Sequence, residues 1–135
     1  MSVILPKLDA MLICDSIITE AGTNKKSLIG VFDNIGTPTF PCKHHMLSVY
    51  VKFTDAQGKY DFKLDLIDLQ TSKVIGEGIV QGLEVSDRLA SSELAFNLLG
   101  LTFPNEGKYQ FRIFANNQFF GSKTFNVISI NKKIG

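Results

Sequence analysis

The sequence predicts an all-β protein, an antiparallel β-sandwich of about seven to nine strands. Two observations favour this class: apolar and polar residues alternate along most of the chain, and turn residues recur every 8 to 15 residues or so. Alternation with a period of two gives each segment one apolar and one polar face, as in a half-buried antiparallel strand. The length of 135 residues fits one core, so we expect residues 1–135 to form a single domain.

Turn residues divide the first half of the chain into strands. We expect strands over residues 10–19 and 27–33, with a turn around Gly22 between them, and a long strand over residues 45–54. Residues 36–41 contain two prolines, which lack a backbone N–H and have a fixed φ. This segment is therefore expected to be a crossing loop or a sheet edge.

The second half continues the same pattern. A hairpin connection over residues 55–58 leads into a strand over 60–68, and a turn at 70–73 leads into another over 74–81. In the strand over 60–68, Asp61 and Asp65 lie opposite the apolar positions, which predicts a solvated face. The Asn116-Asn117 pair separates two alternating runs, and Asn tolerates the positive φ of a two-residue hairpin turn.

Two segments allow more than one interpretation. Residues 86–99 alternate with period two from Leu94 onward, which favours a strand, although Ser86 is compatible with a short helical turn over residues 86–90. The run Gly76-Glu77-Gly78 lacks the third glycine and the following helix of a phosphate-binding loop. These glycines are expected to mark a bulge or a close approach of the backbone.

The segment over residues 101–109 predicts the kind of sandwich. In immunoglobulin-like sandwiches a tyrosine at the start of the penultimate strand folds its hydroxyl back onto the preceding connection. Pro104 and Gly107 supply a bend just before Tyr109. We therefore expect an immunoglobulin-like sandwich with such a tyrosine corner, the alternative being that Tyr109 is an ordinary core aromatic.

Four segments of the sequence together are familiar from known proteins: Leu12–Asp15, Ser27–Ile35, Pro38–Pro41 and Gly107–Arg112. Through these segments the chain resembles, over nearly its whole length, a family of small bacterial proteins classed only as a domain of unknown function. The resemblance implies a one-domain β-sandwich of bacterial, cytoplasmic origin. It implies no activity and no site residues.

Charge and hydropathy exclude several classes of partner. Fourteen Lys and Arg against 13 Asp and Glu give a net charge of +1, which indicates neither nucleic acid nor an anionic membrane. No apolar run approaches the roughly 18 residues of a membrane span. The N-terminus lacks the order of a secretory signal, so we expect a cytoplasmic protein whose Cys14 and Cys42 are free thiols.

The residues capable of catalysis are few. Cys42, His44 and His45 are close in sequence, but on a strand the two histidines point to opposite faces and cannot readily share an ion. The sequence contains no Gly-x-Ser-x-Gly elbow and no phosphate loop. We expect no cofactor, no metal and no enzymatic activity, and the alternative is an enzyme whose site lies near these three residues.

Three phenylalanines suggest a binding surface. Phe119 and Phe120 are adjacent, so on a strand one of them must point away from the core, and Phe114 alternates with core residues. Outward rings rimmed by Arg112 and Lys123 have the composition of an interface centre. The competing interpretation is that the N-terminal segment, residues 1–8, covers these rings within the same chain.

These observations favour a non-enzymatic binding or assembly module that recognises a protein partner or a second copy of itself. A structural subunit that forms a homo-oligomer through an uncovered edge strand is the first alternative. The enzyme with a site near Cys42 is the second.

Overall fold

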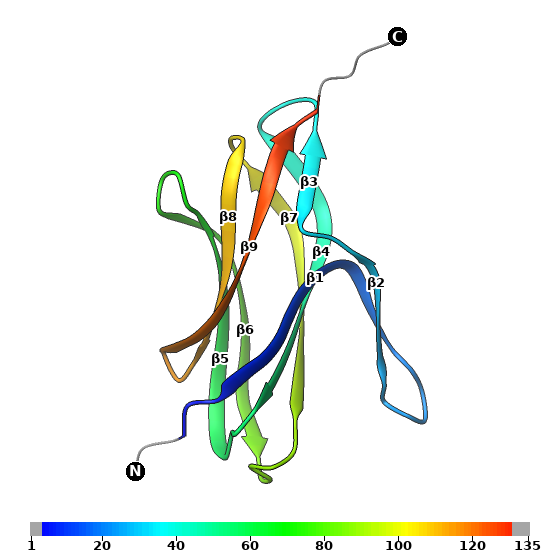
Figure 1. The fold of residues 1–135 in the computed structure, drawn as a ribbon, viewed down its shortest axis with the longest axis vertical. Helices are drawn as coiled ribbons and strands as arrows, with labels where there is room; N and C mark the ends of the chain where they lie inside the picture. The colour runs from blue at the N-terminus through cyan, green and yellow to red at the C-terminus, as the bar shows by residue number, and fades with distance from the viewer. Residues whose placement is uncertain (1–3, 131–135) are drawn as a thin grey trace.

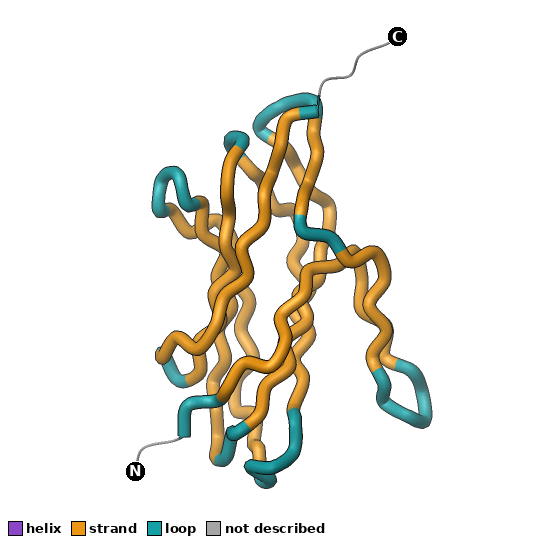
Figure 2. Tube along the Cα trace, in the orientation of Figure 1, coloured by secondary structure: helices purple, strands orange, loops and turns teal. Residues whose placement is uncertain are grey.

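A computed structural model describes residues 4–130 of the chain, all of them in strands, turns and loops (Figures 1 and 2). The nine strands are β1 (Lys7–Thr19), β2 (Lys26–Val31), β3 (Asn34–Thr37), β4 (Cys42–Thr54), β5 (Gly58–Asp68), β6 (Lys73–Val85), β7 (Ser92–Phe103), β8 (Gly107–Ala115) and β9 (Gln118–Ser129). The part of the chain described here has no helix long and apolar enough to cross a membrane.

The strands form two sheets that pack face to face. One has the order β2-β1-β4-β7 and the other the order β3-β9-β8-β5-β6. All neighbours are antiparallel except β3 and β9, which run parallel. The chain crosses from the first sheet to the second between β2 and β3, between β4 and β5 and between β7 and β8 (Figure 1). The predicted all-β sandwich, with nine strands, is confirmed.

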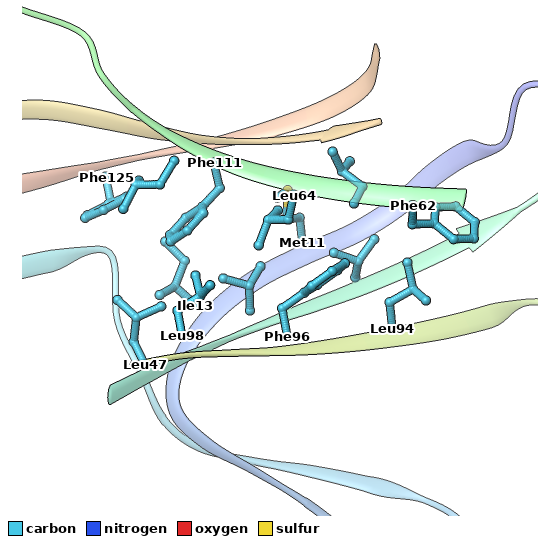
Figure 3. Close-up of a cluster of buried hydrophobic side chains, with 14 of the residues drawn as sticks. Met11, Ile13, Leu47, Phe62, Leu64, Leu94, Phe96, Leu98, Phe111 and Phe125 are labelled. Atoms are coloured by element: carbon cyan, nitrogen blue, oxygen red, sulfur yellow. The ribbon is translucent and has the colours of Figure 1, made fainter. Parts of the chain in front are cut away.

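The core lies between the sheets and is rich in aromatic rings (Figure 3). Phe111 stacks on Phe125 with ring centroids 5.4 Å apart, and Phe125 meets Phe103 edge to face at 5.9 Å. At the other end Phe62 stacks on Tyr60 at 5.4 Å. Each alternating strand therefore contributes its apolar face to one continuous core.

The turns form where the sequence predicts them. Asn116 and Asn117 have φ values of 48° and 67°, the left-handed conformation of a tight hairpin, and this turn joins β8 to β9. Asp55, with φ of 57°, lies in the connection from β4 to β5. Residues 86–90 form a turn closed by the Ala90 N–H and the Asp87 carbonyl at 3.2 Å, without a helix. The period-two interpretation of the segment that follows is confirmed, because β7 spans Ser92–Phe103.

The two glycines of β6 allow close approach of the sheets, as predicted. A Cβ on Gly76 would lie 2.8 Å from Leu101 Cδ2, and one on Gly78 would lie 2.8 Å from Phe96 Cδ1. The register of β5 against β6 also shifts beside Gly76, between Leu66 and Ile67. Small residues here let β7 side chains pack directly on the β6 backbone.

The prediction of a solvated face for Asp65 is wrong. Asp65 is only 3% exposed and forms an ion pair with Arg112, which is its cross-strand neighbour on β8. Asp61 lies in the exposed part of the strand, where its Oδ1 accepts a hydrogen bond from the Gly82 N–H at 2.9 Å. The alternation of the sequence correctly predicted that Asp65 points away from the core. It did not reveal that the Arg112 side chain buries the Asp65 carboxylate on that face.

The tyrosine corner is present. The buried Tyr109 hydroxyl donates to the Asn105 carbonyl at 2.5 Å and accepts from the Asn105 N–H at 3.3 Å. These bonds tie the start of β8 to the connection from β7 that precedes it. The Tyr109 ring packs edge to face on Phe103 at 5.0 Å, so the corner also belongs to the core.

We expect Tyr109→Phe to lower the free energy of unfolding by about 0.5–1.5 kcal/mol, because it deletes these hydroxyl bonds and keeps the packed ring. Chemical denaturation of both forms measures the difference. An unchanged midpoint would mean that the hydroxyl bonds do not stabilise the corner.

Candidate functional site

The hairpin of β8 and β9 contains a bulge that sets the direction of its phenylalanines. Ile113 pairs with Gly121 and Phe114 pairs with Phe119, so Phe120 is an extra residue without a cross-strand partner. The bulge reverses the alternation of β9 at this point. As a result Phe119 points outward beside Phe114, although simple alternation from the buried Phe125 would turn it inward.

Phe119 is part of a row of outward side chains across the five-stranded sheet. Phe119 pairs with Phe114, Phe114 with Lys63, and Lys63 with Ile79, so the row crosses β9, β8, β5 and β6. The rings of Phe114 and Phe119 meet edge to face at 5.9 Å. Phe119 is 52% exposed and Ile79 is 60% exposed. We call these four side chains, with the neighbouring Arg112, the aromatic face.

Two cations hold the Phe114 ring. The Lys63 Nζ lies 5.1 Å from the ring centroid and the Arg112 guanidinium 5.6 Å from it, both within cation–π range. Arg112 is fixed in turn by Asp65, with Nε–Oδ1 at 2.8 Å and Nη2–Oδ2 at 2.7 Å. Hydrogen bonding to Asp65 raises the pKa of the Arg112 guanidinium above its ordinary value. The aromatic face is therefore rigid at its centre while Phe119 and Ile79 remain open at its ends.

The other predicted residues of this surface lie elsewhere. Phe120 packs against the core, with its ring centroid 6.2 Å from that of Phe53 and 6.1 Å from that of Phe62. Lys123 pairs with the core residue Phe111 and so leaves β9 on the face opposite Phe119. The correction for Phe120 follows from the bulge, which sequence alternation does not reveal, whereas Lys123 shares the face of Phe125 by simple alternation.

The N-terminal segment takes a path across the inner side of this hairpin. Leu8 packs against Gly121, where an added Cβ would lie 2.3 Å from Leu8 Cδ2. The Ile4 carbonyl accepts a hydrogen bond from the Tyr60 hydroxyl at 2.5 Å. The described part of this segment, residues 4–8, therefore lies with Phe120 and the core and does not cover the aromatic face; residues 1–3 lie outside the described residues.

A pocket of about 290 Å³ adjoins the aromatic face at the hairpin tip. Lys63 and Ile79 form one wall, and Asp61, Gln81, Asn116 and Asn117 supply polar groups around it. Its volume is near the lower limit of ligand pockets, roughly 300 Å³. Lys63 and Ile79 carry no sequence signal for this role, because each is an unremarkable outward residue of its own strand.

A larger cavity of about 540 Å³ lies where the chain crosses from β2 to β3. Cys42 and His44 line it together with Asp15 and Lys43, so the structure brings together two of the three predicted alternative site residues. The His44 ring is held between Phe32 at 6.1 Å and Phe103 at 6.5 Å. His45 is exposed and is absent from the cavity wall.

The described residues around this cavity lack the contacts of a catalytic or metal site. No hydrogen bond joins Cys42, His44 and Asp15 within residues 4–130. No group of three or more Cys, His, Asp or Glu side chains among these residues is arranged to hold a metal ion. The cavity is thus a second candidate for a small ligand, with the half-buried Cys42 in its wall.

The two thiols differ in how accessible they are to solvent, and we expect Cys42 to react before Cys14. Burial raises the pKa of the Cys14 thiol, with the neighbouring Asp15 charge adding to the effect, whereas Cys42 is half-buried at the cavity. A thiol reagent should modify Cys42 in the native protein and Cys14 after denaturation. Mass spectrometry of the labelled protein identifies the site. Two thiols that stay unreactive in denaturant would indicate a disulfide instead.

The strand order, the parallel β3–β9 pair and the tyrosine corner define an immunoglobulin-like sandwich with a solvent-exposed aromatic surface. A family model described as "Family of unknown function (DUF6941)" matches residues 9–128. The chain belongs to this family.

Comparison with solved structures gives an immunoglobulin-like protein from Pseudomonas aeruginosa as a similar chain. It shares 11% sequence identity and a TM-score of 0.41, over 91% of this chain and 96% of that one. No curated protein matches the chain.

Proposed function

We propose that this protein is a non-enzymatic binding module that recognises a protein partner through the aromatic face. The observation that supports this function is the Phe119 ring, which is 52% exposed and packed edge to face against Phe114. A ring that is half exposed gains only part of its burial energy from the fold of its own chain, whereas full burial of such a ring contributes roughly 1.5–3 kcal/mol.

The chemistry of the face indicates the kind of partner. Asp65 neutralises Arg112, but no described carboxylate forms a salt bridge with Lys63. A bound segment should therefore place one apolar side chain on Phe119 and another on Ile79. Between them it should place a carboxylate beside Lys63. The adjoining pocket of about 290 Å³ receives one further side chain between Ile79 and the hairpin tip.

Phe119→Ser tests the proposal. Capture of partners from the native host by wild-type protein, followed by titration of the captured protein, measures the affinity. We expect the substitution to weaken binding by about 2 kcal/mol or more, as for a buried aromatic anchor, and to leave the unfolding midpoint nearly unchanged.

Leu99→Ser is the matched control, because Leu99 is 69% exposed on β7 of the other sheet. It removes a comparable apolar side chain and should leave binding unchanged. Equal binding by wild type and the Phe119 variant would contradict the proposal. A large loss of stability in the Phe119 variant would instead assign the ring to the core.

A further inference from the structure

The cavity where the chain crosses from β2 to β3 has the size and the walls of a ligand site. Its volume of about 540 Å³ falls within the roughly 300–1,000 Å³ of small-molecule pockets. Val31, Phe32 and Ile35 form an apolar wall on one part of it. In Figure 1 this crossing lies apart from the tip of the β8–β9 hairpin, so the cavity is separate from the aromatic face.

Two opposite charges line the same cavity without pairing. Asp15 comes from β1 and Lys43 from β4, and both side chains are exposed, so they lie where the cavity opens to solvent. Within residues 4–130 the one salt bridge is that of Arg112 with Asp65, so neither charge is neutralised by the described chain. The cavity therefore offers one site for a cationic group and one for an anionic group.

The backbone of β2 makes room for the Asp15 carboxylate. Gly30, which also lines the cavity, has a φ of 69°, a left-handed conformation that favours glycine. A Cβ on Gly30 would overlap the carboxylate of Asp15. The carboxylate therefore lies directly against β2, in a position from which a larger residue at 30 would displace it.

His44 supplies a fixed imidazole to the cavity. Its half-buried ring packs between Phe32 at 6.1 Å and Phe103 at 6.5 Å, and its nitrogens form no hydrogen bond with the residues that the structure describes. An imidazole carries at least one N–H donor in either tautomer. Together with the amine of Lys43, the preceding residue, β4 thus contributes two nitrogen donors to the cavity, whereas β1 contributes a carboxylate acceptor.

We propose that this cavity binds a small zwitterion of the α-amino acid type, a free amino acid or a short peptide with an apolar side chain. The carboxylate of the ligand bonds to Lys43 and His44, its ammonium group bonds to Asp15, and its side chain packs on the apolar wall. A simple anion would leave the Asp15 carboxylate unpaired beside it, and a simple cation would face Lys43. A zwitterion satisfies both charges.

Protection of Cys42 from a thiol reagent tests the site, because this thiol is half-buried in the cavity wall and a bound ligand shields it. Leucine or leucyl-leucine should slow the labelling of Cys42, and comparison of the two distinguishes a free amino acid from a peptide. Leucine amide lacks the carboxylate and N-acetyl-leucine lacks the ammonium group. Each should give the same protection only at a roughly five- to tenfold higher concentration, because one charged hydrogen bond is lost at a partly open site.

Asp15→Asn and Lys43→Gln should each raise the ligand concentration that half-protects Cys42 by roughly five- to tenfold, for the same reason. Asp9→Asn is the matched control, since Asp9 is an exposed carboxylate on the same strand as Asp15 and lies outside the cavity wall. It should leave protection unchanged. Absence of protection by both zwitterions would overturn the proposal. Equal protection by the blocked analogues, or an equal effect of Asp9→Asn and both cavity variants, would also overturn it.

Discussion

Phe125→Ala should lower the free energy of unfolding by about 3–5 kcal/mol, the range for deleting a fully buried aromatic ring. Phe125 is 1% exposed and packs against Phe103, Tyr109 and Phe111 with centroid distances of 5.4–6.0 Å. Its removal opens a cavity that links both sheets of the sandwich. Urea denaturation of wild type and variant measures the loss.

Phe119→Ala on the same strand is the matched comparison. It removes the same ring from the outward face and should cost less than about 1 kcal/mol, because that ring is half exposed and meets Phe114 edge to face at the surface. Similar losses for the two variants would contradict the division of β9 into an inward and an outward part at the bulge. The comparison therefore tests the geometry on which the aromatic face depends.

Strand identity and turns were predictable from the sequence because they depend on local chemistry. Period-two alternation placed Leu94, Phe96 and Leu98 on one strand face, and all three are buried. The Asn116-Asn117 turn follows from the tolerance of Asn for positive φ. Tyr109 was recognisable because proline and glycine precede it at the spacing that a corner requires.

The composition of the candidate site was predictable only in part, since it depends on register. The sequence indicated that one of Phe119 and Phe120 points outward, but the bulge that selects Phe119 arises from pairing with β8. Lys63 and Ile79 join the aromatic face because β5 lies between β8 and β6, an order that is set by the whole fold. The same limit explains why Asp65 was expected in solvent: its cover, Arg112, is 47 positions away in sequence.

The register also explains how an exposed aromatic cluster stays ordered. Phe114, at the centre of the row, has a complementary cross-strand neighbour on each side, the Phe119 ring and the Lys63 amine. Arg112 adds a second cation and is itself held by the buried Asp65. The ion pair therefore connects the stability of the sheet to the geometry of the surface that we propose binds a partner.

Arg112→Met is expected to lower the free energy of unfolding by about 3 kcal/mol, because it leaves the Asp65 carboxylate buried without its partner. The value lies at the lower end for a buried pair, since the Arg112 side chain is 30% exposed while that of Asp65 is 5% exposed. The substitution also removes one of the two cations over Phe114. Partner binding should weaken together with stability.

The double variant Arg112→Met, Asp65→Leu separates the two effects. It removes both charges, so stability should return to within about 1 kcal/mol of wild type, because an apolar pair of similar volume replaces the ion pair at little cost. Lys63 still lies over Phe114 in this variant, so any remaining loss of binding measures what Arg112 contributes to the aromatic face. A double variant as unstable as Arg112→Met alone would show that the buried carboxylate is not the cause of the loss.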